Sequence, residues 1–241
     1  MLKVKLDKFI ARYNLGGNVE SVKWSSDGDT LQTQFVSADK ALLGDVKVKH
    51  FPLEAGDVGV YVTGELKGLL GVLGDNIDLH LSKFGDKAVA LNVKSGAVSF
   101  DYVLSDLSVI PEPSKLKKIP EFGVKIEIDS DFMSTFIKGK TALPDVDKFT
   151  IVTNKKTGEL EVVIGYSSIN SNRVNIPVTS TANNLSKAIS FNANMFKEVL
   201  TANKECVTAI LEVSNAGLAR INFKVDDYDS TYYMVATKEV D

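Results

Sequence analysis

The chain repeats one order of secondary structure in its two halves, and this repetition restricts the folds open to it. Each half has two amphipathic segments at helical spacing, set among short runs that alternate apolar and polar residues. The strands predicted in the first half are Val19–Ser25, Leu31–Val36, Val46–Phe51, Asp57–Tyr61, Ile77–Lys83, Ala88–Lys94 and Ala97–Leu104. Those predicted in the second half are Val124–Ile128, Lys148–Asn154, Leu160–Tyr166, Arg173–Val178, Lys187–Phe191, Thr208–Ser214, Ala219–Val225 and Thr231–Thr237. The pattern predicts an α+β protein made of two similar domains.

Four apolar stripes predict the helices. The stripes of the first half are Leu6, Phe9, Ile10 and Tyr13, then Leu66, Leu69, Leu70 and Leu73. Those of the second half are Phe132, Met133, Phe136 and Ile137, then Met195, Phe196, Val199 and Leu200. Thr63 and the run Asp129-Ser130-Asp131 are the predicted N-caps, and Gly16-Gly17 and Gly74 the predicted stops.

A proline-bearing stretch without alternation, residues 105–123, separates the two halves. Its prolines are Pro111, Pro113 and Pro120, and three lysines, Lys115, Lys117 and Lys118, lie among them. Proline and the loss of periodicity favour an extended linker. We therefore expect a first domain at 1–105, a connector at 106–122 and a second domain at 123–241.

Composition excludes several classes of protein. The 241 residues are 44% hydrophobic and 24% charged, which suffices for a buried core. A single cysteine, Cys206, excludes an internal disulfide, and the absence of any long apolar run indicates no membrane span, so we expect a cytoplasmic protein. The net charge of −3 argues against a simple basic nucleic-acid binder unless positive charge gathers on one surface.

The chain resembles the DNA sliding clamps over its whole length, and is most similar to the T-even bacteriophage clamp and the proliferating cell nuclear antigen. The stretches that carry the resemblance are Asp57–Tyr61 with Gly68–Leu73, Leu107–Glu112, Phe196–Leu200 with Asn203–Cys206, and Ser214–Phe223 with Tyr232–Ala236. The resemblance implies antiparallel sheets outside and two helices inside in each domain. It also implies a homotrimeric ring around double-stranded DNA, with a DNA polymerase and an ATP-dependent clamp loader as partners, in a host cell's cytoplasm if a phage encodes the protein.

The predicted helices carry a net positive charge although the whole chain is acidic. Their basic residues lie off the apolar stripes, where they would face DNA in a clamp without reading its sequence. These predicted DNA-facing residues are Lys5, Lys8, Arg12, Lys67, Lys138, Lys140, Lys197 and Lys204. The alternative is that these lysines are simply solvated, and that Lys138 and Lys140 suit the helix dipole.

A partner groove is expected where the linker carries apolar residues. The linker residues are Leu107, Val109, Ile110 and Pro111, and the alternative is that they only pin the linker to the sheets. The resemblance adds Leu42 and Leu43, in a turn that lies under the connector in relatives, and Val235 near the chain end.

Subunit contacts are expected at sheet edges. Pro177 cannot donate to a strand ladder, so its strand should be an edge strand. The resemblance implies that this edge pairs with the last strand of the first domain of the next protomer. The interface residues are then Val98, Phe100, Tyr102, Val103, Val174, Ile176, Pro177 and Val178.

Signals for an enzyme are weak, and we expect no catalytic site, metal or cofactor. His50 and His80 fall in strand-like runs, and Cys206 has no catalytic motif. Asp226-Asp227 with Asp229 lacks the spacing of a calcium loop and predicts a hairpin turn. Two other classes remain: a β-rich viral structural protein, and a single-strand nucleic-acid binder, which would need exposed aromatic residues among basic ones.

Overall fold

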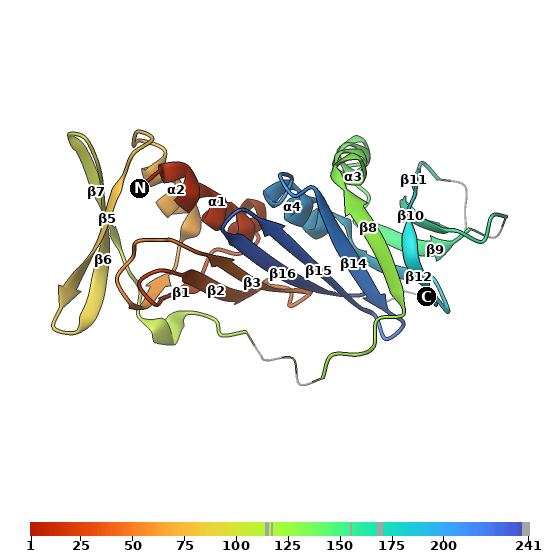
Figure 1. Cartoon of the computed structure of the whole chain (residues 1–241), viewed down its shortest axis with the longest axis horizontal. Coiled ribbons are helices and arrows are strands. Elements are labelled where there is room, and N and C mark those ends of the chain that lie inside the picture. Colours follow the sequence, from red (N-terminus) through yellow and green to blue (C-terminus); the bar gives the residue numbers. More distant parts are fainter. Residues whose placement is uncertain (114–115, 117, 155, 168–170, 238–241) are drawn as a thin grey trace. The chain divides into compact units, whose positions relative to one another are not determined.

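The structure, a computed structural model, describes residues 1–113, 116, 118–154, 156–167 and 171–237 as an α+β chain (Figure 1). The chain divides into two compact units. Unit 1 contains Met1–Ala38, Leu43–Ser114 and Asp226–Ser230, and unit 2 contains Asp39–Leu42, Lys115–Val225 and Thr231–Asp241. The predicted α+β class is confirmed, whereas Lys115 and Lys117 of the expected connector lie outside the described residues.

Unit 1 holds two helices and two antiparallel sheets. Its helices are α1 (Lys3–Asn14) and α2 (Thr63–Leu70). One sheet has the order β4-β1-β2-β3, with β1 (Val22–Ser26), β2 (Leu31–Val36), β3 (Leu42–Val48) and β4 (Gly56–Val60). The other is β5 (Asp78–Phe84), β6 (Lys87–Ser95) and β7 (Val98–Val103), followed by a 3-10 turn at Leu107–Val109.

Unit 2 repeats this plan. Its helices are α3 (Ser130–Ala142) and α4 (Ala193–Ala202). One sheet has the order β12-β8-β14-β15-β16, with β8 (Val124–Asp129), β12 (Ser180–Asn183), β14 (Thr208–Ser214), β15 (Leu218–Val225) and β16 (Tyr228–Val235). The other has the order β11-β10-β9-β13, with β9 (Lys148–Thr153), β10 (Leu160–Ile164), β11 (Val174–Pro177) and β13 (Ile189–Asn192).

The predicted apolar stripes form the two cores. In unit 1, Phe9 of α1 meets Trp24 of β1 edge to face, with ring centroids 5.7 Å apart. In unit 2, Phe196 of α4 lies 4.9 Å from Phe136 of α3 and 4.8 Å from Phe149 of β9, measured between ring centroids. Burial of these aromatic rings supplies much of the hydrophobic stabilisation of each unit.

The predicted start of α2 is wrong. Thr63 is the first helical residue and not the N-cap, and its hydroxyl donates to the carbonyl of Glu20 at 2.7 Å. The carboxylate of Glu20 instead accepts from the backbone N–H of Gly64 at 2.7 Å, so a residue far away in sequence satisfies the helix end. The prediction for α3 is confirmed, because Asp129 accepts from the N–H of Phe132 at 2.7 Å.

Three other details differ from the predicted elements. β3 begins at Leu42 and ends before His50, whose φ of 53° is incompatible with a continuing strand. The isolated bridge between Leu2, just before α1, and Asn76 was not among the predicted elements. β12 was missed because Ser180–Asn183 is polar, and the strand forms by pairing with β8.

The edge position predicted for the Pro177 strand is confirmed. β11 is an outermost strand of its sheet in the described part of the chain, with Pro177 opposite Glu161 of β10. β7 is likewise outermost, beside β6. Both strands named as interface candidates therefore present an edge with unpaired backbone groups.

Candidate functional site

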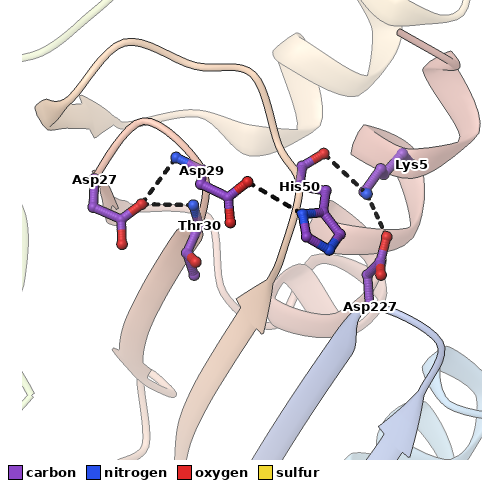
Figure 2. Close-up of polar contacts among 6 residues, drawn as sticks. All are labelled: Lys5, Asp27, Asp29, Thr30, His50 and Asp227. Atoms are coloured by element: carbon purple, nitrogen blue, oxygen red, sulfur yellow. Dashed lines mark hydrogen bonds and ion pairs between the residues drawn. The ribbon is translucent and has the colours of Figure 1, made fainter.

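The basic residues of α1 fall into two groups with different surroundings. Lys5 donates to the Asp227 carboxylate at 2.5 Å and to the carbonyl of His50 at 3.1 Å (Figure 2). Its ammonium holds the pKa of the Asp227 carboxyl below the usual range. Lys8 is partly exposed on the same helix. Lys5 therefore ties α1 to two loops and is already engaged with a carboxylate.

Arg12 does not fit the predicted DNA-facing set, and we correct it. Its side chain is 1% exposed, its guanidinium lies 4.2 Å from the ring centroid of Tyr228, and it donates to the carbonyl of Lys8 at 3.0 Å. A cation packed on an aromatic face inside unit 1 stabilises the fold. The sequence missed Tyr228 as its partner because the two residues are distant in the chain.

The polar loops beside Lys5 form a chain of contacts (Figure 2). His50 Nδ1 lies 3.2 Å from the Asp29 carboxylate, and the Asp27 carboxylate accepts from the N–H groups of Asp29 at 2.9 Å and Thr30 at 2.6 Å. Asp226 and Asp227 lie in the turn between β15 and β16, which confirms the hairpin predicted there. The described residues contain no group of three or more potential ligands arranged to hold a metal ion.

Lys67 of α2 is exposed and donates to the Asn14 side chain at 3.2 Å. Asn14 in turn donates to the Glu20 carboxylate at 3.1 Å, so these residues link α1 to α2. Asp7 of α1 lies nearby, and burial raises the pKa of its carboxyl while Lys3 and Lys67 lower it less. No spacing in the sequence could reveal these contacts, because they join separate elements.

The basic residues of unit 2 also divide by exposure. Lys140 is 3% exposed and donates to the carbonyls of Leu143 at 3.2 Å and Pro144 at 2.8 Å, so it caps the end of α3 and leaves the DNA-facing set. Lys138 of α3 and Lys204, just beyond α4, are exposed. Lys197 of α4 is partly exposed, 3.9 Å from the carboxylate of Glu198.

The predicted partner-groove residues belong to both units, so the groove itself stays a prediction. In unit 1, Leu107, Val109 and Pro111 are exposed, and Leu43 is partly so. In unit 2, Val235 is exposed and Leu42 is buried.

Two groove residues must be corrected, the buried Leu42, which is 1% exposed, and Ile110. Ile110 is 5% exposed, and its Cγ1 lies 3.2 Å from where a Cβ on Gly59 would be. Ile110 therefore pins the 3-10 turn to β4 and offers little surface to a partner. For Ile110, the alternative interpretation therefore holds: this apolar residue pins the linker to a sheet.

The predicted interface strands expose some side chains and bury others. On β7, Val98 and Val103 are 48% and 76% exposed, Phe100 is partly exposed and Tyr102 is buried. On β11 and just after it, Pro177 is exposed, Val174 and Val178 are partly exposed, and Ile176 is buried at 6%. Tyr102 and Ile176 thus belong to the cores of their own units, which narrows the side chains able to cross an interface.

The residues considered for catalysis have ordinary surroundings. Both histidines are exposed, His50 after β3 and His80 on β5. Cys206 is buried and its thiol donates to the carbonyl of Thr208 at 3.2 Å. No described helix is long and apolar enough to cross a bilayer.

Comparison with known proteins identifies the fold. No family model matches the sequence, and no curated protein matches it significantly. Solved structures do match: a proliferating cell nuclear antigen from Entamoeba histolytica aligns with a TM-score of 0.74 at 14% identity, covering 98% of this chain and 96% of that one. The chain has the sliding-clamp fold.

Two further structures share this clamp fold. The A. fulgidus antigen bound to the C-terminal region of FEN-1 aligns with a TM-score of 0.74 at 14% identity, over 100% of this chain and 98% of that one. A chain of the PCNA2–PCNA3 complex from Sulfolobus tokodaii aligns with a TM-score of 0.73 at 13% identity, over 99% and 98%. The likeness therefore extends over both units and over nearly all of each neighbour.

Proposed function

We propose that this chain is a protomer of a sliding clamp, a ring that encircles duplex DNA and tethers a DNA polymerase. The observation that carries the proposal is the clamp fold itself, matched over nearly the full length of this chain and of its neighbours. The resemblance implies a ring of six such units, so two units per chain give a homotrimer. The protein would act without a catalytic site of its own.

Exposed lysines on the helices support a DNA-facing role. Arg12 and Lys140 are buried and Lys5 forms an ion pair, so we exclude these three from the proposed phosphate contacts. The remaining proposed contacts are Lys8, Lys67, Lys138, Lys197 and Lys204. A few scattered cations attract phosphate without reading bases, which suits a protein that must move along DNA.

The open edges of β7 and β11 support assembly. β7 and β11 could pair between neighbouring protomers and so continue one sheet into the next. One structural neighbour is a complex of two clamp proteins, PCNA2 and PCNA3.

The remaining parts of the proposal rest on the resemblance in the sequence. They are the boundaries 1–105, 106–122 and 123–241, a partner groove beside Leu107 and Val109, an ATP-dependent loader, and an origin in a T-even-like phage that places the ring in the host cytoplasm. The neighbour bound to the C-terminal region of FEN-1 supports a site for a partner's tail peptide.

The decisive experiment compares circular DNA, which a closed ring cannot leave, with linear DNA, which it can. Light scattering after size exclusion should give about three times the chain mass of 26.2 kDa. A ring loaded on nicked circular DNA should stay bound, and cutting the circle should release it because a ring slides off a free end. A monomer at all concentrations, or equal retention on circular and linear DNA, would refute the clamp.

A further inference from the structure

One face of the β12-β8-β14-β15-β16 sheet is hollowed into a recess of about 650 Å³. The recess lies entirely within unit 2 and is lined by side chains from all five strands. The lining side chains that carry the argument are Lys125, Ile210, Glu212, Arg220, Lys224 and Tyr233. These residues alternate with core residues such as Leu211 and Ile221, so they belong to the face that the core leaves exposed.

The recess is positively charged although the chain is acidic. Lys125, Arg220 and Lys224 face a single lining carboxylate, that of Glu212. Glu212 is shared, since Arg220 Nε donates to it at 2.6 Å and Lys125 Nζ lies 3.4 Å away. Lys224 makes no ion pair within the described residues, so its charge is available to a ligand. The side chains that line the recess therefore carry more positive than negative charge, and Glu127 of β8 lies opposite Ile210 on the same face.

Its floor is held in one geometry. Arg220 Nε donates to the Glu212 carboxylate, and the Arg220 guanidinium lies 4.8 Å from the ring centroid of Phe122. Asn222 donates to the Thr231 hydroxyl at 2.8 Å across the neighbouring strands. A rigid floor lowers the entropic cost of binding.

The recess also has an apolar anchor point. Ile210 is 42% exposed at its wall, and Tyr233 presents part of an aromatic ring. We propose that this recess is a docking site for an acidic peptide segment of a partner protein, with carboxylates meeting Lys125 and Lys224 and one apolar side chain resting on Ile210. The proposal does not depend on the clamp function.

Nucleic acid fits this recess less well than an acidic peptide does. Phosphate backbones are bound by stripes of several cations, whereas here a carboxylate, Glu212, lies among three cations. An exposed aliphatic residue gives no contact to phosphate but does bury a leucine or phenylalanine.

Selection from a library of random displayed peptides tests the proposal. The full-length assembled protein is the target, and binders are counter-selected on a Lys125→Glu, Lys224→Glu double variant. Surviving peptides should be rich in Asp and Glu with at least one large apolar residue. Their affinity should fall about tenfold or more on the double variant and should weaken as salt rises.

Two further variants complete the design. Ile210→Ser should weaken the same peptides, whereas the matched reversal Lys47→Glu with Lys94→Glu, at exposed lysines of unit 1, should not. Unchanged DNA retention by the Lys125, Lys224 variant would separate this site from the clamp function. A selection that yields no peptide lost on the variant, or only basic or uncharged peptides, would overturn the proposal, as would tighter binding of an oligonucleotide than of any peptide at this recess.

Discussion

Lys5 and Asp227 are separated by 222 positions in the sequence, and their side chains meet at 2.5 Å (Figure 2). The pair connects the first helix to the turn before the last strand. The backbone supports the same contact, since the N–H of Lys49 donates to the carbonyl of Asp227 at 3.0 Å and the Tyr228 hydroxyl donates to the carbonyl of Lys5 at 2.7 Å. The third segment of the chain in unit 1, Asp226–Ser230, is thus fastened to α1 and to the segment after β3.

Asp227→Asn should lower the urea midpoint of unfolding at neutral pH. Because Lys5 lowers the pKa of Asp227 in the folded state, the ion pair stabilises the protein above the ordinary value of 3.8, and that contribution disappears as the pH falls through the lowered pKa. The difference between variant and wild type should therefore shrink in acid. Asp226→Asn, a neighbouring exposed aspartate, serves as the control. Equal midpoints for Asp227→Asn and wild type at neutral pH would show that the Lys5–Asp227 ion pair does not stabilise the folded protein.

Asp7→Asn should have the opposite effect on stability. Burial raises the pKa of Asp7, so the ionised form is disfavoured in the folded protein and costs stability at neutral pH. The variant should be more stable than wild type at pH 7, and the gain should vanish below the ordinary value of 3.8, where both states are protonated. Removing a negative charge beside Lys8 should also tighten binding to DNA. A lower midpoint at neutral pH would contradict this account.

Reversing the charge of Lys8, Lys67, Lys138 and Lys197 together should weaken DNA retention and polymerase processivity while the fold persists. Each lost phosphate contact should make the negative slope of log affinity against log salt less steep by about 0.9. Single reversals should lower DNA affinity only slightly. Reversal of four exposed lysines away from the helices, Lys47, Lys94, Lys156 and Lys187, controls for net charge. Equal losses in both quadruple variants would mean that the helix lysines have no special role.

Periodicity in the sequence predicted the elements well because burial imposes it. The stripe of Leu6, Phe9, Ile10 and Tyr13 is fully buried, and β2 and β14 occupy the predicted residues. Side-chain partners were not predictable, because they depend on which elements meet. Arg12 and Lys140 looked like surface cations and are buried by Tyr228 and by the end of α3. Glu20 caps α2 from a separate loop, which no local pattern reveals.

The two candidate interface strands should respond differently to a charge. Val103 on β7 is 76% exposed, so Val103→Glu should leave each protomer folded and disrupt the trimer. Ile176 on β11 is 6% exposed, so Ile176→Asp should unfold unit 2 itself, because it buries an unpaired charge. Light scattering and thermal unfolding of both variants separate the two effects. Phe84→Glu, at an exposed tip of the same sheet as Val103, is the matched control. A trimer that survives Val103→Glu would exclude this side chain from the interface.

Truncation of the linker residues should separate partner binding from stability. Leu107 and Val109 are 39% and 55% exposed, so their double alanine variant should keep its stability and weaken a polymerase tail peptide by about 1–3 kcal/mol. Ile110 is buried against β4, so Ile110→Ala should instead cost about 2–5 kcal/mol of unfolding free energy. Calorimetry with the peptide and urea unfolding measure the two quantities on the same samples. Unaltered peptide affinity for the Leu107, Val109 variant would show that the groove does not include these linker residues. An Ile110→Ala variant as stable as wild type would contradict the structural role of Ile110 and leave it a candidate for partner binding.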